Sequence, residues 1–246
     1  SLLYNELKLN PEVVIEPTSG LGNFIKAALN TFSTIKKIVG VEINPEYCDE
    51  CKKRISDDRL HIVNDNFFTY KIEKYVGETE TLFLGNPPWA TNSELNFNLP
   101  EKENFKRLSG TDAITGASNF DICEYIILKL IEKSVNKNVA IAMLCKTSVA
   151  RNVLLELDRN DVCVDDLRIY NFDSSKVFGI SAPACLLYIK MSTSNSKCRE
   201  CEVYDIETPN TISGRISFQN GKLSNLDDDV LDLDGEIVFE WRQGVK

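Results

Sequence analysis

The segment Asn86-Pro87-Pro88-Trp89 combines a side-chain amide, a rigid turn and a large aromatic ring. It follows the apolar run 81–85, which is typical of a buried strand ended by a glycine. The prolines restrict the backbone and remove two N–H donors, and a residue before proline is held extended, so the Asn86 amide has a defined direction. This pattern predicts a small polar pocket at a strand end. The simpler alternative is a strand-ending turn with a packed tryptophan.

A second candidate segment lies near the start of the chain, where the β-branched run 13–15 is followed by Glu16, Pro17, Gly20 and Gly22. An amphipathic helix is predicted next, which gives the strand, glycine turn and helix of a nucleotide-binding crossover. Glycines let the backbone approach a ligand closely, and a helix N-terminus offers unpaired N–H groups. The third glycine of the dinucleotide-binding fingerprint is missing, so this segment alone is a weak indication.

Polar residues also follow the next two predicted strands: Glu42 ends the second, and Asp65 and Phe67 follow the third. An acid at the second strand end accepts hydrogen bonds from ribose hydroxyls in this architecture. An acid beside an aromatic ring could hold the amino group and the face of an adenine. The alternatives are that Glu42 caps the helix beginning near Pro45 and that Phe67 belongs to the core. The four strand ends are expected to share one crevice at the carboxyl edge of a sheet.

Composition limits the classes of protein to consider. The 246 residues are 43% hydrophobic, which is enough for a large folded domain. The sequence has no apolar run of about 18 residues that could cross a membrane, and its first residues lack a signal-peptide pattern, so we expect a cytoplasmic protein. The net charge of −9 argues mildly against a nucleic-acid partner, although residues 192–246 carry six basic and eleven acidic residues and so account for −5 of it.

The eight cysteines include two pairs with metal-like spacing, Cys48 with Cys51 and Cys198 with Cys201. The pairs are far apart in the chain, unlike those of a zinc ribbon, and the single histidine, His61, is near neither. We therefore predict reduced thiols and no metal site.

The motifs at the four predicted strand ends can be taken together: they are Glu16-Pro-x-x-Gly20-x-Gly22-x-Phe24, then Glu42, Asp65-Asn66-Phe67 and Asn86-Pro87-Pro88-Trp89. This set resembles the class I S-adenosylmethionine-dependent methyltransferases. Among these they resemble the DNA adenine-N6 methyltransferases whose cofactor motif precedes the catalytic one. The glycine motif is shared by every methyltransferase of this fold, whereas Asn-Pro-Pro-Trp is the specific part. Two departures are that only about 12 residues precede the first strand, where the family has a cofactor-contacting segment, and that a long polar loop occupies 90–117.

The resemblance covers about residues 12–191 and implies an α/β, Rossmann-like methyltransferase fold with a seven-stranded, mostly parallel sheet and helices on both faces. The later elements agree with it: a helix over 122–133, a strand over 139–144, a helix from about 148, and strands over 167–172 and 184–190. We assign residues 1–191 to the catalytic domain.

After residue 191 the composition changes. Residues 192–196 read as a linker, and short strands are predicted over 201–206, 212–218 and 237–241, so that a small β-rich extension follows the catalytic domain. In the resembling family a target-recognition domain lies there. We expect residues 192–246 to be a linker and the beginning of that region, or the chain to be a truncated piece.

The resemblance also implies roles for the cofactor residues. S-adenosylmethionine is expected to lie across the strand ends with its methionine part near Glu16, Pro17, Gly20 and Gly22. Glu42 is expected to hold the ribose hydroxyls, and Asp65 and Phe67 the adenine.

On the substrate side, Asn86 and the Pro87 carbonyl are expected to accept the two N6 hydrogens of a flipped adenine, within the catalytic segment Asn86, Pro87, Pro88 and Trp89. Trp89 is expected to stack on one face of that base. Phe178 is a candidate for the other face, although a core position is as plausible. Lys106 and Arg107, in the loop 90–117, are candidate nucleic-acid contacts, against the alternative of a solvated insertion.

The expected function is therefore adenine-N6 methylation of DNA from S-adenosylmethionine, within a restriction-modification system in which a restriction or specificity subunit is a candidate partner. No membrane association is expected. The same fold acting on RNA adenine or on a protein glutamine amide stays open, although the glutamine enzymes usually carry Tyr where Trp89 stands. A non-catalytic S-adenosylmethionine-binding subunit would not need the Asn86 amide.

Overall fold

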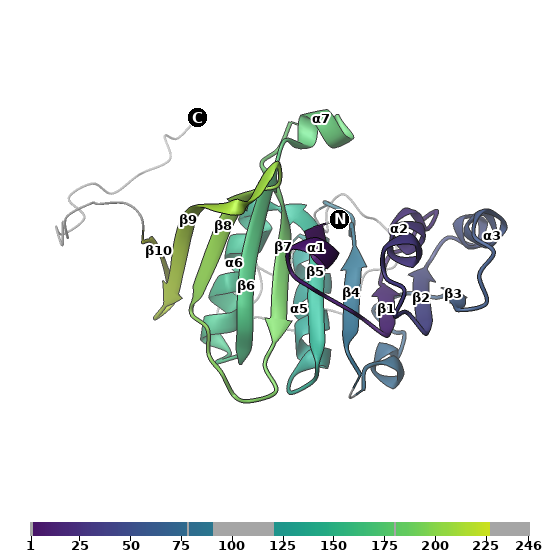
Figure 1. The fold of residues 1–246 in the computed structure, drawn as a ribbon, viewed down its shortest axis with the longest axis horizontal. Helices are drawn as coiled ribbons and strands as arrows, with labels where there is room; N and C mark the ends of the chain where they lie inside the picture. The colour runs from purple at the N-terminus through teal and green to yellow at the C-terminus, as the bar shows by residue number, and fades with distance from the viewer. Residues whose placement is uncertain (1, 78, 91–120, 180, 227–246) are drawn as a thin grey trace, which may run out of the picture.

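The computed structural model describes residues 2–77, 79–90, 121–179 and 181–226. These residues build one sheet with helices packed on its two faces (Figure 1). Residues 91–117 of the expected loop and the expected strand over 237–241 lie outside the described residues. In chain order the elements are α1 (Leu2–Asn5), β1 (Val13–Glu16), α2 (Asn23–Thr31), β2 (Lys37–Glu42), α3 (Pro45–Arg54), β3 (Leu60–Asn64), η1 (Ile72–Tyr75), β4 (Thr81–Gly85), α5 (Ile122–Ser134), β5 (Val139–Lys146), α6 (Thr147–Arg159), β6 (Val164–Phe172), α7 (Ser174–Phe178), β7 (Ala184–Met191), β8 (Glu200–Asp205), β9 (Thr208–Gln219) and β10 (Lys222–Asn225).

The strand order, β10-β9-β8-β6-β7-β5-β4-β1-β2-β3, places β1 at the centre of the cofactor half. Strands β3, β2, β1, β4 and β5 are parallel, and β7 runs antiparallel between β5 and β6. The carboxyl ends of the parallel strands therefore meet at the upper edge in Figure 1. The predicted seven-stranded, mostly parallel sheet is confirmed as the larger part of this sheet.

Burial on both faces of the sheet explains why the central strands are apolar along their whole length. In β5, Val139, Ile141 and Met143 face the core side that holds α5 and α6, whereas Ala140 and Ala142 face the side of α1 and α2. A parallel strand covered on both faces needs such a continuous apolar run.

The C-terminal strands continue this sheet. β8 pairs in parallel with β6, and β9 and β10 follow as antiparallel neighbours. Cys201, Ile216 and Phe218 are buried in the core that α5 and α6 cover. Residues 192–196, expected as a linker, form a compact turn in which the Ser192 Oγ accepts hydrogen bonds from the N–H groups of Ser194 and Ser196, each at 3.1 Å. The boundary at 191 and a recognition region beyond it stay predictions.

Within the described part of the chain, no helix has the length and apolar character needed to cross a membrane.

Candidate active site at the carboxyl edge of the sheet

The sequence-predicted residues gather along one edge because the strands that carry them are neighbours. Moving across the sheet from β3 to β4, the strand ends present Asp65, Glu42, Glu16 and Asn86. The strand order reverses between β1 and β4, which is where an open α/β sheet forms its ligand crevice. The side chain of Glu16 lies against β4, since its Cγ is 3.4 Å from the position that a Cβ on Gly85 would take.

The glycine turn after β1 uses its two glycines differently. Gly20 has φ +50°, and a Cβ built there would meet no atom of the described residues within 4 Å, so among these residues open space lies in front of it. Gly22 has φ +77°, and a Cβ there would collide with the Sγ of Cys51 on α3. Both positions favour glycine by conformation, but Gly22 is also required by helix packing. Gly20 alone leaves room for a ligand.

Unsatisfied polar atoms collect in this turn. Glu16 is only 3% exposed, and its Oε2 has no hydrogen-bond partner within the part of the chain that the structure describes. Burial, with the nearby Glu42 carboxylate, raises the pKa of Glu16 well above its ordinary value, although a backbone hydrogen bond at Ile25 opposes this. The hydroxyls of Thr18 and Ser19 are likewise buried, and no described residue is a hydrogen-bond partner to either. A buried, unpaired carboxyl beside two hydroxyls is suited to bind a cationic or hydrogen-bonding ligand group.

Thr18 and Ser19 were not among the predicted site residues. The signal that could have found them is their position inside the Glu-Pro-Thr-Ser-Gly turn, where small hydroxyl side chains adjoin the space expected for the methionine part of the cofactor.

Glu42 fastens the turn to the second strand. Its Oε2 accepts a hydrogen bond from the Gly20 N–H at 2.7 Å, and its Oε1 accepts one from the Asn44 N–H at 2.8 Å. The helix α3 is capped by Asn44 itself, whose Oδ1 accepts from the Glu46 N–H at 2.9 Å. The alternative in which Glu42 caps α3 is therefore not what the structure has. Each carboxylate oxygen keeps a further lone pair for a ligand hydroxyl.

At the end of β3, Asp65 and Phe67 take different environments. Asp65 is exposed, and its Oδ1 accepts a hydrogen bond from the Asn66 N–H at 2.7 Å. Phe67 is 5% exposed and packs in the core, edge-on to Phe68 with ring centroids 5.7 Å apart. In this structure Phe67 therefore has the core position that the sequence left as the alternative, and its adenine contact stays a prediction.

The catalytic segment follows β4 directly. The Oδ1 of Asn86 is buried and has no hydrogen-bond partner among the described residues, so a strong acceptor lies at the strand end next to that of Glu16. Pro87 is buried and Pro88 is exposed. The indole Nε1 of Trp89 donates to the Leu144 carbonyl of β5 at 3.3 Å, which anchors the ring through its polar end.

Phe178, at the end of α7, lies against Trp89. Their ring centroids are 5.6 Å apart and the ring planes are 82° from parallel. A perpendicular pair in contact has no parallel slot between its rings, so a base held between the two would require them to separate. Phe178 is 38% exposed at the end of a five-residue helix. The candidate contacts Lys106 and Arg107 lie outside the described residues.

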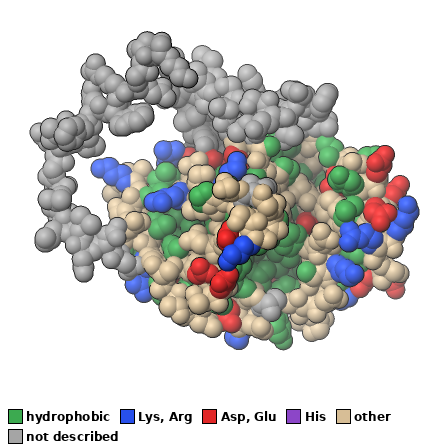
Figure 2. Space-filling view, turned by 90° about the horizontal axis from the view of Figure 1, so that it is seen from above, with side chains coloured by type: hydrophobic (Ala, Val, Ile, Leu, Met, Phe, Trp, Pro, Cys, Tyr) green, Lys and Arg blue, Asp and Glu red, His purple; other side chains and the backbone are tan. Residues whose placement is uncertain are grey.

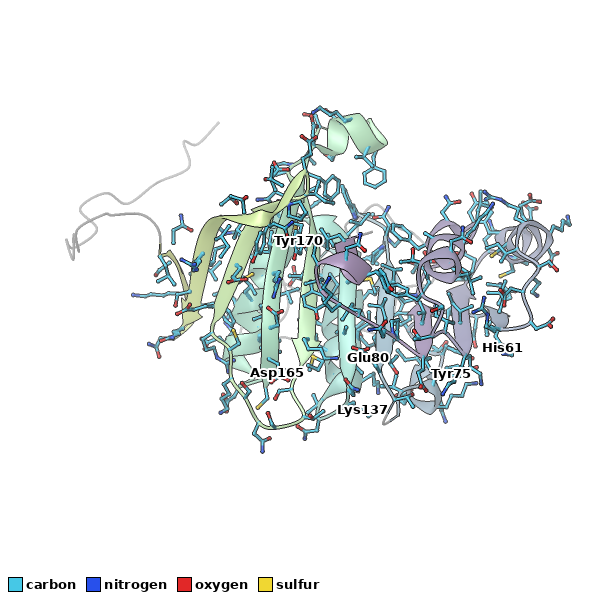
Figure 3. All side chains as sticks on the ribbon, viewed as in Figure 1. His61, Tyr75, Glu80, Lys137, Asp165 and Tyr170 are labelled. Carbon is cyan, nitrogen blue, oxygen red and sulfur yellow. The ribbon has the colours of Figure 1, made fainter. Side chains whose placement is uncertain are left out.

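The charges around this edge are mixed. Figure 2 views the molecule from above, onto the carboxyl ends, and its described surface shows acidic and basic side chains interspersed with hydrophobic ones. A hollow of about 650 Å³ lies elsewhere, lined by Gly77, Lys137, Asn138 and Thr193 among others. Those residues flank the amino ends of β4 and β5, where Figure 3 labels Glu80 and Lys137, so this hollow is separate from the candidate site.

The described residues include no group of three or more His, Cys, Asp and Glu side chains placed to hold a metal ion. Cys48 and Cys51 are buried on α3, and burial is the main cause that raises the pKa of each thiol.

Solved structures share this fold over most of the chain. One is a protein of Listeria monocytogenes described as a class I S-adenosylmethionine-dependent methyltransferase, with 12% identity and a TM-score of 0.54, covering 85% of this chain and 63% of that one. Another is the methyltransferase subunit of a type I restriction-modification system from Streptococcus thermophilus, with 12% identity and a TM-score of 0.53. The match covers 83% of this chain and 44% of that one. The chain thus has the class I S-adenosylmethionine-dependent methyltransferase fold.

The sequence adds a nearer relative. The chain is 36% identical, over 98% of its length, to the type II methyltransferase M.NspV of Nostoc sp.. It spans about half of that relative, 52% of its length. No protein-family model matches the chain. The resemblance to class I methyltransferases, drawn from the motifs, is confirmed by these relationships.

Proposed function

We propose that this chain binds S-adenosylmethionine and transfers its methyl group to the N6 amino group of adenine in DNA, as the methyltransferase of a restriction-modification system. The observation that carries the proposal is the buried Oδ1 of Asn86, which has no hydrogen-bond partner among the described residues and lies at the strand end next to that of Glu16, whose Oε2 likewise has none. The relationship to a type II methyltransferase and the shared fold of a type I methyltransferase subunit support it.

The residues present fit the cofactor. Glu16 offers a buried acceptor for the ammonium group of the methionine part, and Gly20 leaves space for it. Glu42, already oriented by two backbone N–H groups, would accept the ribose hydroxyls. Asp65 and Phe67 remain our candidates for the adenine end. When bound, the cofactor supplies an electrophilic methyl group at the edge between β1 and β4.

The chemical difficulty lies in the target amine, whose lone pair is delocalised into the purine ring. The Asn86 Oδ1 and the Pro87 carbonyl would each accept one N6 hydrogen, draw the nitrogen towards tetrahedral geometry and free its lone pair for in-line attack. Positioning and electrostatics do this work, and no general base needs to be invoked. As the new N–C bond forms, the bond from that carbon to the sulfonium sulfur would break and a neutral thioether would leave. The extra proton would then pass from the nitrogen to water.

Adenine must leave a duplex to reach this edge. Trp89, anchored through its Nε1, would stack on the flipped base, a contact worth roughly 1–3 kcal/mol for bases on aromatic rings. Phe178 is our candidate for the opposite face, once its edge contact with Trp89 opens.

The test is methyl transfer from tritiated S-adenosylmethionine to DNA, RNA and protein in parallel, followed by identification of the labelled nucleoside or amino acid. We expect N6-methyladenine in DNA. Label in RNA adenine or in glutamine would replace the proposed substrate, and cofactor binding without transfer to any of them would contradict an enzymatic role.

Asn86→Ala should lower kcat by about 100-fold or more, because it removes an acceptor used only as the nitrogen changes geometry. S-adenosylmethionine affinity, measured by calorimetry, should stay within about twofold, since Asn86 directly follows β4 and lies outside the glycine turn. Near-normal turnover of this variant would remove the mechanism.

A further inference from the structure

The indole of Trp89 donates a hydrogen bond to an acceptor that lies 55 residues away in the sequence. The Leu144 carbonyl that accepts from the Trp89 Nε1 at 3.3 Å also lies 3.7 Å from the Sγ of Cys123, which donates to it. One backbone oxygen of β5 therefore joins the catalytic segment to α5.

The start of α5 holds the other end of the same segment. The N–H of Ile122 donates to the carbonyl of Ala90, the residue after Trp89, at 3.0 Å. Asp121 caps this helix, because its Oδ1 accepts from the Cys123 N–H at 2.9 Å. The exit of the catalytic segment is thus fixed to the first turn of a 13-residue helix.

The second oxygen of Asp121 closes a ring of contacts. Asp121 Oδ2 pairs with the Lys146 Nζ at 3.0 Å, and Lys146 is the last residue of β5, two positions after Leu144. The two side chains are 13% and 31% exposed, so the pair is partly shielded from water. The ring runs from Trp89 to Leu144, along β5 to Lys146, across to Asp121 and back through Ala90.

We propose that the Asp121–Lys146 ion pair is a positioning device that sets the angle of the Trp89 ring and, with it, the placement of the catalytic segment. This inference rests on the proposed function, because Trp89 needs a fixed plane only if a base stacks on it. Neither charged group is required to touch the substrate. Small misplacements of a catalytic group have large kinetic effects, so a pair of modest strength can still control turnover.

The chain offers a matched control at the opposite edge of the sheet. The Lys190 Nζ pairs with Glu80 at 3.0 Å, with side chains 22% and 24% exposed, and likewise ties separate elements together. Glu80 lies low in Figure 3, away from the carboxyl edge. Lys190→Met therefore removes a comparable ion pair without touching the ring that contains Trp89.

The experiment compares Lys146→Met, Lys146→Arg and Lys190→Met in the intact protein carrying Trp241→Phe. The sequence has two tryptophans, and Trp241 lies outside the described residues, so fluorescence then reports on Trp89. Each variant is assayed for kcat, for the KM of S-adenosylmethionine, and for acrylamide quenching of Trp89.

We expect Lys146→Met to lower kcat about tenfold or more with the cofactor KM within about twofold, and to raise Trp89 quenching. Lys146→Arg should restore most of both, and Lys190→Met should change neither. Equal effects of Lys146→Met and Lys190→Met, or a loss of kcat with unchanged Trp89 quenching, would overturn the positioning role. If the unaltered protein methylates no substrate, the proposed function fails, while the quenching comparison still tests the ring of contacts.

Discussion

At the scale of single residues, Glu16 has the environment that most invites a ligand. Its carboxyl is buried, and one of its oxygens has no partner among the described residues. Burial is the main cause that raises the pKa of Glu16 above its ordinary value of 4.5, and the Glu42 charge is a smaller cause in the same direction. The folded protein without cofactor therefore binds a proton at Glu16 more strongly than the unfolded chain does. Its contribution to the free energy of unfolding is greatest at low pH and falls as pH rises through the interval between 4.5 and the raised pKa.

Glu16→Gln tests this directly. The variant should lose that decline in stability with pH, measured by urea unfolding across the interval, because the amide does not ionise. It should also bind S-adenosylmethionine roughly 10–100-fold more weakly, since a hydrogen bond to a charged partner is lost. Calorimetry in buffers of different ionisation enthalpy should find a proton released on binding to the unaltered protein and not to the variant. Equal proton release from both would show that Glu16 is not the coupled group.

At the scale of elements, the two glycines of the turn between β1 and α2 have different roles: Gly22 allows α3 to pack closely, and Gly20 leaves space for a ligand. Gly22→Ala should destabilise the protein by about 1–3 kcal/mol, because the new Cβ meets the Cys51 Sγ and lies 2.9 Å from the Ile55 Cδ1 at a left-handed φ. Gly20→Ala meets only the conformational cost, about 1–2 kcal/mol, but intrudes on the open space and should weaken cofactor binding more.

Thermal unfolding and cofactor calorimetry on the two variants separate these effects. Adding Cys51→Ala should recover part of the stability lost in Gly22→Ala and nothing of the affinity lost in Gly20→Ala. The reverse pattern would mean that Gly22, and not Gly20, faces the cofactor.

At the scale of the whole molecule, the sheet does not stop where the seven-stranded fold ends. Phe218 on β9 is fully buried in the core that α5 and α6 cover, with the Arg199 guanidinium 5.8 Å from its ring centre. If β8–β10 unfold together with the rest of the sheet, Phe218→Ala should cost about 3–5 kcal/mol and lower the stability seen by every probe.

Urea unfolding followed by Trp89 fluorescence in a Trp241→Phe background and by circular dichroism measures this. The two transitions should coincide and shift together. Ile212→Ala, on the same strand but 38% exposed, is the control and should change stability by less than about 0.5 kcal/mol. A shift seen by circular dichroism alone would mark β8–β10 as a separate unit.

The sequence by itself determined the elements and the order of the site. Residues with local signals are predictable in this way: the glycines of the first turn, Glu42, Asn86 and Trp89 each follow an apolar strand run, and α3 begins at Pro45, where the sequence predicts a helix start. These signals are readable because strand ends, helix caps and turns depend on neighbouring residues. That the four strand ends lie next to one another is expected from a parallel sheet, which the family resemblance also implies.

Only the tertiary structure decided which atoms are paired. Contacts between distant segments decide that Lys146 reaches Asp121 and that Trp89 binds a carbonyl 55 residues away. They also decide that the Glu16 Oε2 and the Asn86 Oδ1 find no partner among the described residues. The attachment of β8 to β6 is of the same kind. Such contacts are set by how whole elements pack. The residue types within one element do not indicate which residue of another element they will contact.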